Sequence, residues 1–389
     1  DDERIRMDFG FTDEQKQLRE AVIAFARQTL NHDFDAREKA GEFSRQLWQE
    51  CARFGIQGMP MPEEFGGSGH DVMTTMMVME ALGYACVDQG LLFCLHAHMW
   101  AIETPLVRFG TDEQKKRFLP GLCDGSIIGA HAMSEPDSGT DAFALRTTAE
   151  LKGDRYVLNG SKTFVTNAPV ADLFLVFATV DRKKGMWGVT GFLVEKGTKG
   201  LSVGRKLEKL GLTTSPTSEV FLEDCEIPAE NRLGRMGQGS AIFNHSMAWE
   251  RSCILGSTVG TMERELEVCV QYARTRKQFG KPIGNFQLVA AKLADMKVRL
   301  ETSRMMLYRA AWAHGRGEPN ALEGAMAKLT ISDAAVASAL DAIQIHGGYG
   351  YMREYQVERH LRDNVASRLY SGTSEIQRLI VARHLGLTP

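Results

Sequence analysis

The sequence predicts a mostly helical α+β protein in which a small β domain lies between two helical domains. Three observations favour this fold class. Apolar residues recur at helical spacing in the first and last thirds of the 389-residue chain. Between them, short apolar runs alternate with Gly, Asn and Asp, which is typical of strands and turns. These strand-like runs do not alternate with helices, and this argues against a Rossmann-type sheet.

The first predicted domain is helical and spans residues 7–122. Thr12 is followed three residues later by Gln15, which is the spacing of a capping box at the start of a helix. Thr111 and Gln114 repeat the same spacing further along the chain. We therefore expect one helix to begin just after each threonine.

The second predicted domain is a β domain that spans residues 123–235. We expect residues 156–166 to form a hairpin with its turn at Asn159-Gly160, since Asn-Gly favours tight hairpin turns. Further strands are expected at 173–180, 189–194 and 219–222. Short strands joined by tight turns predict a small antiparallel barrel or sandwich.

The third predicted domain is a four-helix bundle that spans residues 236–389. Apolar residues follow one helical face from 255 to 270 and another from 289 to 307. Small and apolar residues from 325 to 342 indicate a helix that is buried on most sides. No strand precedes the glycine-rich segment 237–239, so we interpret it as a turn before a helix and not as a nucleotide-binding loop.

Composition excludes several classes of function. The 49 acidic and 46 basic residues give a net charge of −3, which offers no electrostatic surface for nucleic acid. The seven cysteines form no CxxC pair and no metal motif is present, so we expect reduced thiols, no metal and a cytoplasmic protein. No apolar run approaches the ~20 residues needed to cross a membrane. The charged segment 1–6 is expected to be a short added leader before a natural start at Met7.

Four polar clusters resemble motifs of one known family. They are MSEPDSGTD at 133–141, NGSKTFVTN at 159–167, RTRKQFGKPI at 274–283, and QIHGGYG at 344–350 with YSGTSEI at 370–376. In residues, order and spacing they resemble the acyl-CoA dehydrogenase family over essentially the whole chain after Met7. The resemblance implies a helical domain, a β domain and a helical bundle, with FAD as the cofactor and an acyl thioester as the substrate.

The first two clusters resemble the part of the family that contacts the flavin ring. The resemblance implies contacts from Met133, Ser134, Thr140, Phe164 and Thr166, with Thr166 near the hydride-accepting N5 atom. Short hydroxyl side chains suit the hydrogen bonds that a flavin ring needs. Many relatives have tryptophan in place of Phe164. Phenylalanine still covers apolar ring surface but lacks the indole donor.

The RTRKQFGKPI and QIHGGYG clusters resemble the part that reaches the FAD of a neighbouring subunit. The guanidinium of Arg276 suits the pyrophosphate, and the glycines let the backbone approach it closely. The remaining cofactor contacts implied by the resemblance are Arg276, Gln278, Phe279, Gln344, Gly347, Gly348, Thr373 and Glu375. A site that spans subunits requires an oligomer, and the resemblance implies a homotetramer.

Removing the proton next to a thioester carbonyl requires a carboxylate in a dry pocket. One branch of the family carries this glutamate where the present chain has Ser371, which cannot act as a base. The branch that resembles isovaleryl- and long-chain-acyl-CoA dehydrogenases carries it on a helix before an arginine, here Glu250 and Arg251. We therefore expect Glu250 to be the base. Glu375 is a weaker rival, and Arg251, Ser371 and Gly372 are expected to contact the substrate.

The sequence leaves the substrate open between two carriers. Acyl-CoA is the first candidate for FAD-dependent α,β-dehydrogenation. Ala248, however, stands where many CoA-using relatives have an aspartate near the pantetheine arm, so an acyl or aminoacyl group such as prolyl on a carrier protein is the alternative. An electron-transfer flavoprotein is the expected acceptor, with oxygen left open. A non-catalytic scaffold with this fold is the remote alternative.

Overall fold

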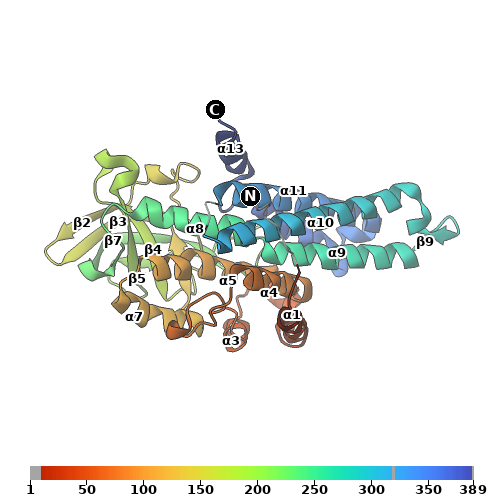
Figure 1. Cartoon of the computed structure of the whole chain (residues 1–389), viewed down its shortest axis with the longest axis horizontal. Coiled ribbons are helices and arrows are strands. Elements are labelled where there is room, and N and C mark those ends of the chain that lie inside the picture. The colour runs from red at the N-terminus through yellow and green to blue at the C-terminus, as the bar shows by residue number, and fades with distance from the viewer. Residues whose placement is uncertain (1–9, 318–319, 388–389) are drawn as a thin grey trace, which may run out of the picture.

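The structure, a computed structural model, describes residues 10–317 and 320–387, so the expectations for residues 1–6 and Met7 lie outside the described residues. Helices form the first and last parts of the chain and a sheet forms the part between them, as predicted. In space the sheet lies at one end of the molecule and the helical bundle extends from it to the other end (Figure 1). Among the described residues, no helix is long and apolar enough to cross a membrane.

In the part of the chain that the structure describes, seven α-helices precede the sheet. They are α1 (Asp13–Phe25), α2 (Phe34–Ala40), α3 (Arg45–Arg53), α4 (Val72–Ala85), α5 (Gln89–His98), α6 (Thr104–Phe109) and α7 (Asp112–Cys123). Both predicted capping boxes are present at the starts of α1 and α7. The hydroxyls of Thr12 and Thr111 accept the N–H of the glutamine three residues on, and each glutamine side chain accepts the threonine N–H. A π-helical turn, η3 (Met99–Glu103), extends α5.

The sheet has eight strands in the order β6-β7-β3-β2-β4-β5-β8, with β1 paired to β4. The strands are β1 (Gly129–Ala132), β2 (Thr148–Lys152), β3 (Arg155–Thr166), β4 (Leu173–Thr179), β5 (Val189–Glu195), β6 (Leu201–Val203), β7 (Thr217–Pro228) and β8 (Arg232–Leu233). The pairs are antiparallel except that β1 and β2 run parallel to β4. Every residue of β4 is buried, as expected of a central strand.

The predicted hairpin turn at Asn159-Gly160 is wrong, because β3 continues through both residues. The register between β3 and β7 shifts at this point, so the dipeptide forms a β-bulge instead of a turn. The side-chain oxygen of Asn159 accepts the N–H of Asp224 across the bulge, at 2.8 Å. The turn between β2 and β3 uses Gly153, whose φ of 63° is left-handed.

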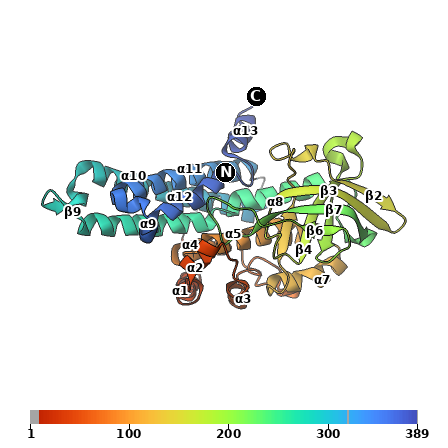
Figure 2. The ribbon, with the colours of Figure 1, turned by 180° about the vertical axis from the view of Figure 1, so that it is seen from behind.

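The helices after the sheet are α8 (Gly239–Cys253), α9 (Gly256–Thr275), α10 (Gln287–Gly315), α11 (Ala321–His346), α12 (Val357–Val365) and α13 (Ser374–His384). Figures 1 and 2 both show α8 leading from the sheet into a bundle in which α9, α10 and α11 lie side by side. A small hairpin of β9 (Lys277–Gln278) and β10 (Lys281–Pro282) closes the end of the bundle that is farthest from the sheet.

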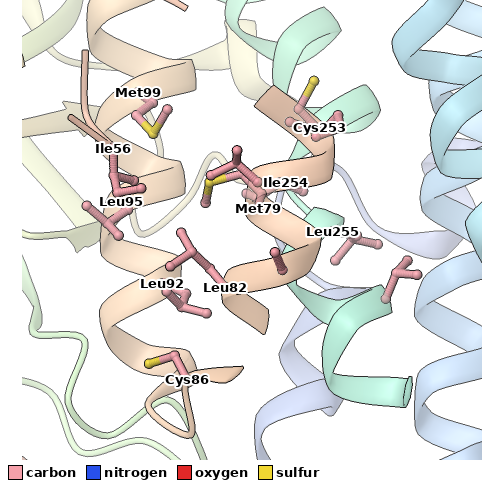
Figure 3. Packing of buried hydrophobic residues seen from close by; sticks show 14 of the residues in the cluster. Ile56, Met79, Leu82, Cys86, Leu92, Leu95, Met99, Cys253, Ile254 and Leu255 are labelled. Atoms are coloured by element: carbon pink, nitrogen blue, oxygen red, sulfur yellow. The ribbon is translucent and has the colours of Figure 1, made fainter. Parts of the chain in front are cut away.

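One hydrophobic core joins the first and last domains. Leu82 of α4, Leu92 and Leu95 of α5, and Leu255 just before α9 are buried in this core, with α4 lying between α5 and the α8–α9 junction (Figure 3). Such close packing fixes the junction between α8 and α9 against α4 and α5. The core therefore holds the end of α8 in a defined position.

Helices α4 and α9 cross with their backbones in contact. A Cβ atom at Gly83 would lie 1.8 Å from the carbonyl oxygen of Ser257, and one at Gly260 would lie 1.9 Å from that of Glu80. No side chain fits at either position unless the helices move apart. The two glycines therefore set the distance between these helices.

We expect Gly83→Ala to destabilise the protein by about 2 kcal/mol, because overpacking of this size forces the backbone to shift. Gly315→Ala on α10 is the matched control, since its Cβ would meet only Val72 at an ordinary 3.8 Å. The control should leave the melting temperature unchanged or raise it slightly. Equal melting temperatures for the two variants, measured by calorimetry, would show that the crossing tolerates a side chain.

Candidate active site

A cavity of about 540 Å³ lies where the three domains meet. Its walls come from α5 and η3, from the ends of β1 and β3, from one face of α8, and from the segment 369–376 around the start of α13. The structure brings ten of the predicted site residues to this cavity: Met133, Ser134, Thr140, Phe164, Thr166, Glu250, Arg251, Ser371, Gly372 and Thr373. Residues more than 200 positions apart in the sequence thus share one site.

Glu250 reaches the cavity from α8 and is itself buried. Its carboxylate accepts a hydrogen bond from the hydroxyl of Ser371. Burial raises the pKa of Glu250 to about 7, although the Ser371 hydrogen bond and the nearby cations Arg251 and Lys328 lower it. A carboxyl group with a pKa near neutrality can accept a proton from a weakly acidic carbon and later release it. Glu250 therefore has the properties of a general base.

The segment that carries Ser371 has an unusual backbone. Ser371 and Gly372 both have left-handed φ angles, of 53° and 86°. Left-handed backbone is costly for serine and persists only where the surroundings enforce it. Thr373 then begins α13, with its hydroxyl accepting the N–H of Ile376. The tight turn between Tyr370 and α13 thus places the Ser371 hydroxyl on the base.

The wall opposite α8 presents an aromatic ring and several hydroxyl groups. Phe164 sits in an irregular part of β3 with a left-handed φ of 55°, lines the cavity and is 72% exposed. The hydroxyls of Ser134, Thr140 and Thr166 belong to the same wall. An open aromatic face beside short hydroxyl side chains fits the flat ring and polar edge of the flavin that the sequence predicts.

A buried ion pair, which the sequence reasoning missed, holds this wall in place. The Lys162 ammonium donates to the Met133 carbonyl at 3.1 Å and to the Glu135 carboxylate at 2.7 Å. The same carboxylate accepts the backbone N–H groups of Arg146 and Thr147. The pair therefore ties β3 to the segment 133–147. A charged residue at a buried strand position was the only signal in the sequence.

His131 was also missed. It lines the cavity, and its Nε2 atom is buried without a hydrogen-bond partner among the described residues. Burial lowers the pKa of His131 to about 4, so the ring is neutral at physiological pH. An unpaired neutral imidazole nitrogen can serve a bound ligand. Nothing in the sequence distinguishes this histidine from a packing residue.

The structure does not bring every predicted residue to Glu250. A second cavity, of about 420 Å³, is lined by Arg276, Gln278, Gly347 and Gly348 at the β9 end of the bundle (Figure 1). Phe279, Gln344 and Glu375 line neither cavity. Phe279 is 92% exposed at the β9–β10 turn.

Glu375 is unsuited to be the base. It is exposed in the first turn of α13, where a backbone N–H and the Thr373 hydroxyl lower its pKa. It therefore stays ionised in water, and it does not line the cavity that holds Glu250.

Aromatic side chains close the inner end of the main cavity. The rings of Phe93 on α5 and Tyr370 lie 4.7 Å apart. Beyond them lies a separate pocket of only about 20 Å³, lined by His96 and Ser257 among others. That volume suits no more than a water molecule. The Phe93 and Tyr370 rings, which line both spaces, therefore lie between the main cavity and this small pocket.

The fold and the cavity together are those of an enzyme, with a buried carboxyl group, Glu250, enclosed between a sheet domain and a helical bundle. Three family models match in order: the acyl-CoA dehydrogenase N-terminal domain at residues 12–126, the middle domain at 130–225 and the C-terminal domain at 237–386. The chain belongs to the acyl-CoA dehydrogenase family. The family and the fold predicted from the sequence are confirmed.

Known relatives include enzymes of both substrate types. An L-prolyl-[peptidyl-carrier protein] dehydrogenase of Pseudomonas fluorescens is 41% identical over 98% of the chain and 100% of the relative. An acyl-CoA dehydrogenase of Bacillus subtilis is 42% identical over 96% of the chain and 98% of the relative.

Solved structures are similar over the same length. The prolyl acyl carrier protein oxidase AnaB is 50% identical with a TM-score of 0.96, covering 97% of the chain and 100% of AnaB. PigA with FAD and proline is 43% identical with a TM-score of 0.96, covering 98% of the chain and 100% of PigA.

We expect Lys162→Met to destabilise the protein by about 3 kcal/mol, because it leaves the Glu135 carboxylate buried without its cation. The double variant Lys162→Met/Glu135→Gln removes both charges and keeps an acceptor for the backbone N–H groups. It should regain more than half of the loss in denaturant unfolding. A double variant as unstable as Lys162→Met would show that loss of the ion pair does not cause the instability of the single variant.

Proposed function

We propose that this protein oxidises a prolyl group held as a thioester on a carrier protein, with FAD as the cofactor and Glu250 as the base. The observation that carries the proposal is the buried Glu250 carboxyl, which lines the same cavity as the open aromatic face of Phe164. The names of several relatives agree with it.

The proposed chemistry removes two hydrogens from adjacent carbons. The thioester carbonyl, held by the backbone at Ser371–Gly372, makes the α hydrogen acidic enough for Glu250 to take it as a proton. The hydrogen on the β carbon leaves with its electron pair, and the product is an α,β-unsaturated thioester. When bound, FAD supplies the acceptor for that hydride. The Ser371 hydroxyl stabilises the carboxylate before the transfer.

One feature of the sequence favours a carrier protein over free coenzyme A. Ala248 offers no carboxylate at the position where many CoA-using relatives have one. A short acyl-CoA is the second candidate, favoured by the identity to an acyl-CoA dehydrogenase.

We further propose a homotetramer in which copies share the FAD sites. The second cavity, with Arg276 and Gln278, lies at the end of the bundle away from Phe164 (Figure 1). Exposed apolar side chains lie near it or along α10, namely Phe279, Leu288, Val298 and Met305. An apolar surface of this kind favours contact with another copy.

The proposed electron acceptor is an electron-transfer flavoprotein, and the proposed location is the cytoplasm. All seven cysteines are buried and none is paired, which agrees with a reducing compartment. Oxygen is the competing acceptor, since one similar structure is named an oxidase. If the protein released hydrogen peroxide in air without an added acceptor, oxygen and not an electron-transfer flavoprotein would be the electron acceptor.

We expect Glu250→Gln to bind FAD and fold normally, but to reduce the flavin about 10³-fold more slowly. Glu265→Gln is the matched control, because Glu265 is a second buried glutamate that does not line the cavity. The measurement is anaerobic loss of flavin absorbance with prolyl-carrier protein, prolyl-CoA and butyryl-CoA. Reduction by butyryl-CoA alone would overturn the carrier proposal, and normal reduction in Glu250→Gln would remove Glu250 as the base.

The rate of flavin reduction should fall as the pH drops through about 7, because protonated Glu250 cannot accept a proton. The Ser371 hydrogen bond lowers the pKa of Glu250, so Ser371→Ala should move this midpoint to higher pH. Anaerobic stopped-flow measurements between pH 5.5 and pH 9 (about the range in which such groups titrate) provide the test. A midpoint that is unchanged in Ser371→Ala would contradict the assignment of this titration to Glu250.

A further inference from the structure

Lys328 is a fully buried lysine that none of the proposed chemistry uses. It lies on α11 beneath the turn that carries Ser371. Its ammonium donates to the carbonyl of Gly372 at 2.6 Å and lies 5.7 Å from the centre of the Tyr370 ring. A buried cation is costly, and proteins keep one only where it is paired or hydrogen-bonded. The hydrogen bond to the Gly372 carbonyl of the turn offsets part of this cost.

The carbonyl groups of the turn are held from below by side chains of three helices. Gly372 accepts from Lys328 of α11 and, at 2.8 Å, from Gln377 of α13. Ser371 accepts from the same Gln377 at 3.2 Å and from Arg251 of α8 at 3.4 Å. These donors draw the carbonyls away from the cavity and enforce the left-handed backbone of the turn. The Ser371 hydroxyl is left to meet Glu250.

We propose that Lys328 is a positioning residue: its ammonium holds the 371–373 turn in the conformation that keeps the Ser371 hydroxyl on Glu250. The inference rests on the proposed role of Glu250 as the base. Lys328 does not touch the substrate or the reacting atoms. It acts through the turn and through its charge.

The charge of Lys328 acts on Glu250 directly. The groups that face this pair are Arg251 beside Glu250 on α8, Tyr370 and Ser371 in the turn, Asp333 on α11 and Glu375 on α13. Lys328, like Arg251, lowers the pKa of Glu250. Burial and Arg251 in turn lower the pKa of Lys328 to about 7, while Glu250 raises it. Each group therefore favours the charged form of the other.

The sign of the effect follows from this coupling. Without the ammonium, Glu250 loses a nearby positive charge, so its pKa rises and less of it is ionised at neutral pH. Without the hydrogen bond to Gly372, the turn is held by Gln377 and Arg251 alone, and the Ser371 hydroxyl is placed less well. The first effect disappears above the pKa of Glu250. The second remains at high pH, because the Lys328 amine keeps N–H donors for the Gly372 carbonyl when it is neutral.

The test compares Lys328→Met, Ser371→Ala and the double variant as FAD-loaded protein. Lys209→Met is the matched control, because Lys209 is also buried and donates to backbone and hydroxyl oxygens, at Ser215 and Thr217. One readout is independent of turnover: infrared difference titration of the Glu250 carboxyl, with Glu250→Gln as the blank. The other is anaerobic flavin reduction at pH 7 and pH 9, with the thioester that reduces the wild type.

We expect Lys328→Met to raise the infrared midpoint of Glu250 by about one pH unit and to slow flavin reduction about fivefold at pH 7 through the smaller ionised fraction. At pH 9, Lys328→Met should slow reduction by itself but add little to Ser371→Ala, because both act through one hydroxyl. Lys209→Met should leave the midpoint unchanged. Lys328→Arg, which keeps the charge, should retain the wild-type midpoint and serves if the methionine variant does not fold.

An unchanged midpoint in Lys328→Met, or losses at pH 9 that multiply in the double variant, would overturn the proposal and leave Lys328 a structural lysine. Failure of the proposed function gives a different result. In that case no thioester reduces the flavin of the wild type, while the infrared midpoint of Glu250 still shifts in Lys328→Met.

Discussion

The removal of water from one carboxyl group constrains the rest of this structure. Glu250 is buried, and that burial is the largest influence on its pKa. A buried carboxylate without partners would be too costly to keep, and one with too many partners would be too weak a base. The site balances these limits with one hydroxyl, Ser371, and two cations, Arg251 and Lys328. Three separate parts of the chain must therefore arrive at one point.

Two buried lysines hold the loops around the Glu250 cavity in position. Lys162 ties the segment after β1 to strand β3, and Lys328 ties the turn before α13 to helix α11. In each case the ammonium donates to a backbone carbonyl on the side of the loop that is away from the cavity. Other groups of the loop are then free to face the cavity. Charge-assisted hydrogen bonds are stronger than neutral ones and fix loops that otherwise lack regular structure. The residues that face a ligand thus depend on cations that do not contact it.

The sequence was most informative where one residue type has one local use. The capping boxes at Thr12 and Thr111 begin helices as predicted, because the hydroxyl and the glutamine act within one turn. The Asn159-Gly160 turn failed because the pairing of β3 with β7, a contact between distant segments, overrode local preference. Ten predicted residues line the main cavity, yet Lys328 was not foreseen. No local pattern marks a lysine whose partner is a carbonyl 44 positions away.

The separation of the two cavities connects the cofactor to assembly. The cavity with the Phe164 wall lies where the three domains meet, whereas the Arg276 cavity lies at the β9 end of the bundle (Figure 1). Helix α9 runs from one region to the other, and its close crossing with α4 at Gly83 and Gly260 fixes the distance between these two helices. The two cavities are separate in the single chain. Under the proposed assembly, another copy supplies the second cavity, and FAD lies between subunits. Bound cofactor would then stabilise the oligomer by mass action, so folding, assembly and cofactor binding would be thermodynamically linked.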